Sequence, residues 1–437
     1  MSSNLEIPFS YYIAIAIWLF LLVEAANKKM RSWAIPALSV YLTTAMWYFT
    51  EVFYSPERLT KFSPSILELG YFQVSFFLIV FRFLVPSLTN SISKRSFKGF
   101  ERNSLTLNPH RLLQILIVIW IALFFFGVSL LNWDVFQALL PQGGRWAPKL
   151  WDRGAVGGDF DFIISAAGYT YALVCAFFGI LFFFQRQSQS KIINLIMIII
   201  SWPAFYLSGA RNSFLAVAMP AYLTYIITSR QSWWLKTIIS VGLLILVNYL
   251  LLIVISFRNS GITDYFDGAV NLSDNATHQG LNMAEELFNI NSFYEQNPSI
   301  LQYGMDYFAE ALNIIPRFIL PNKPAIGYEY NLLRAPSSGI NAATISAGFI
   351  GRGVLNFGTW LGPIAPAILM GIWAGFLARL WEQRSSILRF SLFLMGLGVT
   401  PNLGRDITLL VLWPVLFGYV VILYLEYQNR IQEAKNS

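Results

Sequence analysis

The sequence predicts an all-α, polytopic membrane protein, and three of its features lead to that fold class. The chain has 437 residues, of which 56% are hydrophobic and only 12% are charged, whereas soluble domains carry roughly 25% charged residues. Apolar runs of about 20 residues, the length of a helix that crosses a bilayer, recur along most of the chain. Basic residues gather in the short segments between these runs, so the net charge of +7 indicates membrane topology rather than a nucleic-acid partner.

The apolar runs predict about 11 transmembrane helices. We expect them at residues 9–25, 33–52, 67–87, 112–131, 162–184, 192–208, 213–229, 237–256, 357–380, 387–400 and 407–425. Threading the chain through these helices places six basic segments on one side, at residues 26–32, 88–111, 185–191, 230–236, 381–389 and after 425. They hold more than half of the 30 lysine and arginine residues, which makes this side cytoplasmic and places the C-terminus there.

The N-terminal apolar run predicts a retained helix rather than a cleaved secretory signal. No basic residue precedes this run, whereas Lys28, Lys29 and Arg31 follow it. By the positive-inside rule, the N-terminus then lies outside. The expected location is a membrane that the chain crosses many times.

Between the eighth and ninth predicted helices lies an external segment that is too polar to span the membrane. It divides the chain into transmembrane helices (residues 1–256), a large external loop (257–356) and further transmembrane helices with a cytoplasmic tail (357–437). Within the loop, "NPSILQYGMDYFAEAL" predicts an interfacial helix over 297–312, with Asn297 as its N-cap and Pro298 in the first position. "HQGLNMAEELFNI" (278–290) predicts a second, shorter helix.

Several arginines lie close to apolar runs on the external side, where a charge needs an anionic or aqueous partner. A guanidinium binds phosphate through two hydrogen bonds and keeps its charge when it loses water. Arginines that merely anchor helix ends to lipid headgroups are the alternative, but these should gather in the cytoplasmic loops. We therefore expect a diphosphate-binding site on the external face, built from Arg211, Arg258, Arg317, Arg352 and Arg405, with Arg334 on the same face.

Three titratable residues near one predicted helix start are candidates for acid–base chemistry. Glu285, Glu286 and His278 lie within nine positions of one another in the external loop. A sugar hydroxyl that attacks an anomeric carbon needs a general base, and carboxylates and imidazoles serve in that role. The alternative is that the two acids are solvated loop residues and that His278 is a hydrogen-bonded surface residue.

The chain offers no residue pattern for metal or nucleotide chemistry. Its single cysteine, Cys175, lies inside an apolar run, and its two histidines, His110 and His278, stand far apart in the sequence. A zinc site is therefore not expected. The phosphate-binding GxxxxGK[ST] and metalloprotease HExxH motifs do not occur in the sequence. We expect no metal and no cofactor.

Three stretches of the chain carry a resemblance to a known family. They are "SGARNSFL" (208–215), where arginine opens a helix after a short turn, "IIPRFILPNKP" (314–324) and "AGFIGRGVLNFGTWLGPI" (347–364). Together with the helix layout and the late external loop, they resemble the Wzy-type O-antigen or exopolysaccharide repeat-unit polymerases of bacterial inner membranes. The likeness covers most of the chain and implies a fold like that of GT-C-type polymerases and ligases.

The resemblance implies glycosyl transfer at the outer membrane face without a nucleotide sugar or a required metal. The donor is a polyprenyl-diphosphate-linked glycan, and the acceptor is a sugar hydroxyl of a second linked repeat unit. Arg211 and Arg317 match the arginines of the family stretches and would neutralise the leaving diphosphate. Gly351-Arg352-Gly353 stands where relatives often carry an acid before "NFG". Either that role falls to Glu285 or Glu286, or this protein binds its substrate differently. The implied partners are polyprenyl-diphosphate-linked glycans, membrane lipids and a chain-length-regulating co-polymerase.

Two other functions remain open from the sequence. An O-antigen ligase performs the same chemistry with another acceptor, and it would be expected to rely on a histidine of the external loop, for which His278 is the only candidate. A flippase or transporter of lipid-linked saccharides would be a different class of protein. Transporters usually show repeated halves and polar residues deep in the membrane, whereas polarity here gathers at the external edge.

Overall fold

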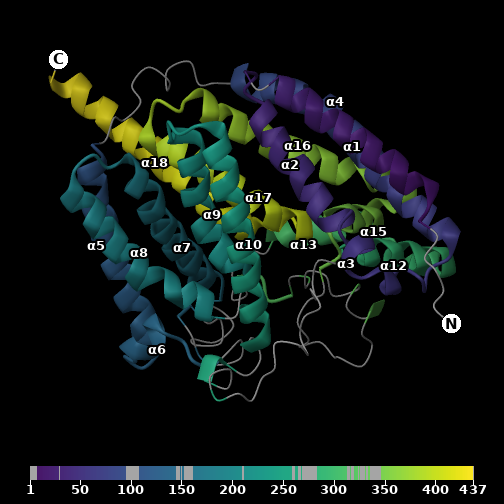
Figure 1. Ribbon diagram of the computed structural model, residues 1–437, viewed down its shortest axis with the longest axis horizontal. Coiled ribbons are helices and arrows are strands. Elements are labelled where there is room, and N and C mark those ends of the chain that lie inside the picture. Colours follow the sequence, from purple (N-terminus) through teal and green to yellow (C-terminus); the bar gives the residue numbers. More distant parts are fainter. Residues whose placement is uncertain are drawn as a thin grey trace. The chain divides into compact units, whose positions relative to one another are not determined.

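The computed structural model describes all of the chain except residues 1–6, 29, 95–107, 144–147, 149, 152–160, 209–210, 258–260, 264–266, 268–282, 313–314, 316–318, 323, 325–329, 331–332, 335–345 and 437. Every regular element within the described residues is helical, which confirms the predicted all-α class (Figure 1).

Eight of the described helices are long and apolar enough to cross a membrane. They are α1 (Phe9–Asn27), α4 (Pro64–Lys94), α5 (Pro109–Leu130), α7 (Asp161–Phe184), α8 (Ser188–Leu207), α16 (Ile364–Glu382), α17 (Ile387–Arg405) and α18 (Leu409–Asn436). The three other predicted spans fall on α2 (Ala34–Tyr48), α9 (Arg211–Thr228) and α10 (Trp233–Phe257). The chain is therefore a membrane-embedded helical protein, with eight crossings supported by length and composition.

The chain divides into two compact units, which are described separately. Unit 1 comprises Met1–Glu101, Gln279–Gln383 and Thr400–Val411, and unit 2 comprises Arg102–His278, Arg384–Val399 and Leu412–Ser437. Of the predicted external loop (257–356), residues 257–278 belong to unit 2 and residues 279–356 belong to unit 1.

Helices α1, α4 and α16 of unit 1 run in the same direction. The carboxylate of Glu68, near the start of α4, accepts hydrogen bonds from the first backbone N–H groups of α1, and Glu24 near the end of α1 pairs with Arg82. Gly371 and Gly375 of α16 lie against the second half of α4. If α4 and α16 both span the membrane, the chain crosses it an odd number of times between them. Three candidate spans, α5, α7 and α8, lie between them. If these three cross the membrane, α9 and α10 either both cross it or both do not.

Two shorter helices, α12 (Met283–Gln296) and α15 (Phe349–Leu361), pack against each other and against α4. Phe288 of α12 lies edge-on to Tyr71 of α4, with ring centroids 5.2 Å apart. Phe349 is the first residue of α15, and its ring centroid lies 4.8 Å from that of Phe77 of α4. These buried aromatic contacts bring the long segment before α16 onto the first half of α4. They fix the position of α12, whose first turn carries Glu285 and Glu286.

The predicted helix over 297–312 is not continuous. A 3-10 turn covers Pro298–Ile300, and the α-helix α13 begins only at Met305 and ends at Leu312. Between them, Tyr303 and Gly304 adopt φ angles of 50° and 88°, which end a right-handed helix, and glycine accepts that conformation without strain. The neighbouring helix α12 has 14 residues against eight in α13, so the expectation that it is the shorter one is also wrong.

The predicted span at 357–380 consists of two helices rather than one. Gly358 has φ 79° and ψ −178° inside α15, a conformation that a residue with a side chain rarely adopts. Helix α15 ends at Leu361 and α16 starts at Ile364, after Gly362 and Pro363. The "NFG" stretch therefore forms a kink near the end of α15 and does not open the spanning helix.

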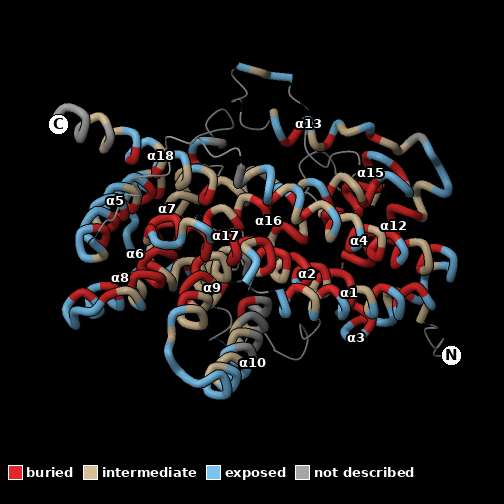
Figure 2. Tube along the Cα trace, turned by 90° about the horizontal axis from the view of Figure 1, so that it is seen from above, coloured by how far each residue is buried: buried red, intermediate tan, exposed pale blue. Residues whose placement is uncertain are grey.

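In unit 2, helices α5, α8 and α9 each pack against α7. Helix α5 starts three residues earlier than predicted, because the Asn108 side chain accepts a hydrogen bond from the His110 N–H (3.0 Å) and Pro109 occupies the first position. Helix α10 is apolar, and the side chains that the structure describes in it are mostly exposed or half-buried (Figure 2). Cys175 is buried in α7, in agreement with its place in an apolar run.

Candidate functional site

Glu285 and Glu286 lie in the first turn of α12, and both side chains are buried. Acidic residues in the first turn of a helix are stabilised by the unpaired N–H groups and the positive dipole end. Burial removes the alternative that these are solvated loop acids. A buried carboxylate has to be paired or protonated, since its ionised form loses the solvation that water provides.

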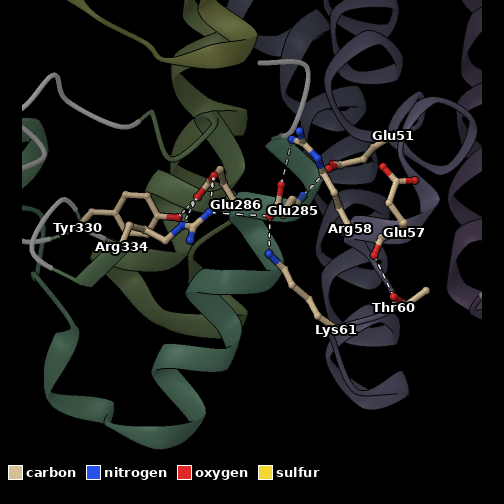
Figure 3. Close-up of polar contacts among 9 residues, drawn as sticks. All are labelled: Glu51, Glu57, Arg58, Thr60, Lys61, Glu285, Glu286, Tyr330 and Arg334. Atoms are coloured by element: carbon tan, nitrogen blue, oxygen red, sulfur yellow. Dashed lines mark hydrogen bonds and ion pairs between the residues drawn. The ribbon is translucent and has the colours of Figure 1, made fainter. Parts of the chain in front are cut away.

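Three basic side chains surround the carboxylate of Glu285 (Figure 3). Lys61 donates a hydrogen bond to its Oε1, Arg58 approaches Oε2 at 3.6 Å, and Arg334 lies 3.9 Å from Oε1. Arg58 belongs to the 3-10 turn Pro56–Arg58 between α2 and α4. The site therefore joins the segment that follows α2 to the segment that precedes α15, two predicted external regions.

Glu286 is enclosed more tightly than Glu285. The Arg334 Nε donates to its Oε2 at 2.9 Å, and Arg334 Nη2 donates to its Oε1 at 3.1 Å, which is the bidentate geometry of a strong charge-assisted pair. The Tyr330 hydroxyl donates to the same carboxylate. Burial of Tyr330, reinforced by the negative charge of Glu286, holds the pKa of its phenol well above the ordinary value. The hydrogen bond to Glu286 raises the pKa of Arg334, which therefore stays charged.

A third carboxyl group, that of Glu51, lies against the same helix turn. Its Oε2 accepts the backbone N–H of Glu285 at 2.9 Å, and the residue is only 3% exposed. Burial raises the pKa of Glu51 to about 8, since a charged carboxylate is disfavoured where water is excluded. Glu51 belongs to α3 (Glu51–Tyr54), a single turn just after α2.

These residues form one group, which we call the Glu285 cluster. Its members are Glu51, Arg58, Lys61, Glu285, Glu286, Tyr330 and Arg334. The side chains of its three cations are 24–46% exposed, whereas those of Glu285 and Glu286 are 8% and 3% exposed. The carboxylates thus form the buried base of the cluster, and the cations lie between them and solvent. An anion that approaches from solvent meets the cations first.

Arg352 occupies a second polar site, where both of its terminal nitrogens donate to protein groups. Its Nη1 donates to Asp406 (2.6 Å) and to the carbonyl of Ile407 (3.0 Å). Its Nη2 donates to the Asp306 carbonyl (3.0 Å) and lies 3.7 Å from Glu310. The guanidinium connects α13 and the turn after α17 to α15 through bonds from its two terminal nitrogens.

The structure places the other predicted residues as follows. Arg405, at the end of α17, donates from Nε to the Ser346 hydroxyl at 2.9 Å. Helix α9 begins at Arg211, as the sequence predicts, but the side chain lies outside the described residues. Arg258, Arg317 and His278 also lie outside them.

Three members of the Glu285 cluster, Glu51, Arg58 and Lys61, are not among the site residues that the sequence predicts. Arg58 and Lys61 lie in a short segment that the sequence marks only as external, and Glu51 falls within the predicted span at 33–52. A carboxylate inside an apparently membrane-spanning run is itself a signal of a functional or structural site. Glu51 could have been found on that ground, whereas the two cations could not.

The fold and the cluster define a membrane-embedded helical protein with a buried carboxylate group beneath a layer of cations. Among the described residues, no three His, Cys, Asp or Glu side chains are placed to hold a metal ion. Comparison of the chain with protein-family models, with curated proteins and with solved structures finds no match.

Proposed function

We propose that the protein is a polymerase that joins polyprenyl-diphosphate-linked oligosaccharide repeat units by glycosyl transfer. In this proposal the chain crosses a bacterial inner membrane 11 times, and the Glu285 cluster faces the outer side. The observation that carries the proposal is the convergence of Arg58, Lys61 and Arg334 on the buried carboxylates of Glu285 and Glu286. Such a site offers cations for a diphosphate and a carboxylate for a hydroxyl.

The reaction forms one bond and breaks one. The acceptor hydroxyl attacks the anomeric carbon of the donor, and the bond from that carbon to the diphosphate oxygen breaks with its electron pair. Negative charge then develops on the phosphate oxygens, where preorganised cations in a water-poor site stabilise it most. In our proposal, Arg58, Lys61 and Arg334 supply that stabilisation, with Arg211 and Arg317 as further candidates from the sequence.

Of the two buried carboxylates, we assign the general base to Glu285. Its partners Lys61 and Arg58 are partly exposed, so a hydroxyl that enters between them reaches this carboxylate first. Glu286 is held by Arg334 and Tyr330 on both oxygens, and it positions Arg334. Neither role requires a nucleotide or a metal.

The test is a polymerisation assay in a strain that lacks the gene, complemented with wild type or with single variants. We expect Glu285→Gln and Arg334→Ala to leave single repeat units on the lipid carrier. Glu295→Gln and Arg186→Ala are the matched controls, because both side chains are exposed and Glu295 lies on the same helix α12. Both controls should give long chains.

Three results would contradict the proposal. If long chains form on the carrier without the gene but never reach their final acceptor, the protein is a ligase, and His278→Ala should then abolish transfer. If the strain without the gene accumulates lipid-linked repeat units on the inner leaflet of the membrane, the protein is a flippase. Normal chains from both Glu285→Gln and Arg334→Ala, with each variant inserted in the membrane, would remove the Glu285 cluster from the chemistry.

A further inference from the structure

The Glu285 cluster contains one buried polar atom whose role the proposed function leaves open. The Oε1 of Glu51 is fully enclosed and has no hydrogen-bond partner, while Oε2 of the same carboxyl group accepts the Glu285 N–H. An unpartnered oxygen of an ionised, buried carboxylate is costly, whereas a protonated carboxyl group avoids that charge. The burial of Glu51 and the two carboxylates beside it therefore indicate that Glu51 holds a proton.

Three neighbouring elements place charged or titratable side chains near Glu51. Helix α12 presents the carboxylates of Glu285 and Glu286, the 3-10 turn presents Arg58, and α4 presents the buried phenol of Tyr71. Two carboxylates nearby oppose ionisation of a third, and Arg58 only partly offsets them. These contacts, together with desolvation, account for a pKa of Glu51 raised to about 8.

The protonation state of Glu51 decides the charge balance of the whole cluster. With Glu51 protonated, the three cations Arg58, Lys61 and Arg334 carry one positive charge more than the two remaining carboxylates, counted over the residues of the cluster that the structure describes. With Glu51 ionised, three carboxylates balance three cations, and an incoming anion gains no net attraction. The cations are the partly exposed members, so the excess charge lies where a ligand arrives.

We propose that the cluster binds a phosphate-type anion together with a proton on Glu51, and that loss of this proton releases the anion. The inference rests on the proposed function, because it concerns the same cluster, and it adds a coupling between substrate uptake and protonation. Glu51 acts through the charge of the cluster and through the Glu285 N–H. It is a positioning residue, since its carboxyl group is buried beneath the cations.

Sulfate is a suitable probe, because its charge stays constant between pH 6 and pH 9 and only the protein titrates. Its dissociation constant is measured on the full-length protein in nanodiscs, at fixed ionic strength. For wild type we expect binding about tenfold weaker at pH 9 than at pH 7, as linkage to one group with a pKa of about 8 requires. Glu51→Gln should bind sulfate equally at both pH values, with an affinity close to that of wild type at pH 7.

The control is Glu57→Gln, which removes an exposed carboxylate from the same loop and should keep the wild-type pH dependence. The inference is overturned if Glu51→Gln retains that dependence or if wild type shows none. If Glu51→Gln does not fold, calorimetry on wild type at pH 8 in buffers of different ionisation enthalpy replaces it. Binding should then take up about half a proton per sulfate, and zero uptake would reject the coupling.

Two sources of phosphate chemistry are distinguished by competition at pH 7. Displacement of sulfate by dimethyl diphosphate, at concentrations where glycerophosphoglycerol has no effect, supports the diphosphate of a lipid carrier as the ligand. Displacement by glycerophosphoglycerol alone would overturn that assignment in favour of a phospholipid headgroup. The outcomes also separate the two proposals. Proton-coupled binding with normal polymerisation by both Glu285→Gln and Arg334→Ala removes the Glu285 cluster from the chemistry and leaves the coupling standing, whereas uncoupled binding with a polymerisation defect rejects only the coupling.

Discussion

Two buried ion pairs of this protein look alike in composition and differ in what surrounds them. In unit 2, Arg389 of α17 donates to both oxygens of Glu426 of α18, at 3.1 Å and 2.6 Å, and the two side chains are 3% and 0% exposed. In unit 1, Arg334 grips Glu286 with the same fork, but the Arg334 side chain is 24% exposed. Two further cations, Arg58 and Lys61, contact the neighbouring carboxylate of Glu285. We call the first pair closed, because both of its side chains are buried, and the second open, because its arginine is partly exposed to solvent.

In our proposal, this difference in exposure separates a structural contact from a binding site. In the closed pair, Arg389 meets the carboxylate of Glu426 and also lies over the Tyr419 ring, 5.9 Å from its centroid. In the Glu285 cluster, three cations meet two firmly paired carboxylates and a third, Glu51, whose charge depends on pH. A buried, balanced ion pair offers no free charge to a ligand. We propose that an open cluster with excess positive charge can bind an anion.

The largest effect should follow from breaking the closed pair. We expect Glu426→Ala to lower the free energy of unfolding by about 3–5 kcal/mol, because it leaves Arg389 buried without its counter-charge. The double variant Arg389→Met with Glu426→Leu should recover most of that loss, since hydrophobic residues of similar volume often replace a buried pair. Unfolding of both variants in detergent measures the effect. A loss of activity in folded Glu426→Ala protein, with unchanged stability, would instead make this pair a second functional site.

A smaller loss is expected at Arg352, which the sequence assigns to diphosphate binding and the structure surrounds with acceptors. Lysine keeps the charge but loses the planar fork, so Arg352→Lys gives up at least one of the bonds to Asp406, Ile407 and Asp306. A hydrogen bond to a charged group contributes roughly 1.5–3 kcal/mol, so we expect a loss of about 2 kcal/mol.

The readout that separates the two roles of Arg352 is the sulfate affinity of the folded variant. A structural role predicts wild-type affinity in the fraction of Arg352→Lys that remains folded. Weaker binding with unchanged stability would restore Arg352 to the anion site, as the sequence predicts.

The helices of this protein could be predicted from the sequence because each apolar run contains its own signal. Helix α1 starts at the predicted residue, and α5 and α7 lie within three residues of their predicted bounds. The break at Gly304 has a local signal, since glycine often interrupts a helix, but periodicity alone does not show that Tyr303 joins it with a positive φ.

The composition of the candidate site could be predicted only in part, since its contacts are not local. Glu285 and Glu286 could be selected because they stand next to a helix start in a polar segment. Their partners Arg58 and Lys61 lie more than 200 positions away in the chain. No periodicity or motif connects the two segments. They meet because Phe288 packs against Tyr71 and Phe62, and that contact depends on tertiary packing.

The smallest effect on stability, and the sharpest test of the comparison, concerns Lys61. Its side chain is 46% exposed where it pairs with Glu285, and the buried carboxylate of Glu285 keeps Arg58 and Arg334 as cationic partners when Lys61 is removed. Lys61→Met should therefore leave the free energy of unfolding nearly unchanged. It also removes the cluster's excess positive charge, so sulfate binding at pH 7 should fall to the weak level of wild type at pH 9. Lys191→Met, which removes an exposed lysine of α8, should change neither quantity. If Lys61→Met costs stability like a closed pair and binds sulfate normally, then the open character of the cluster does not make it a binding site, and the contrast with Arg389 and Glu426 loses its functional meaning.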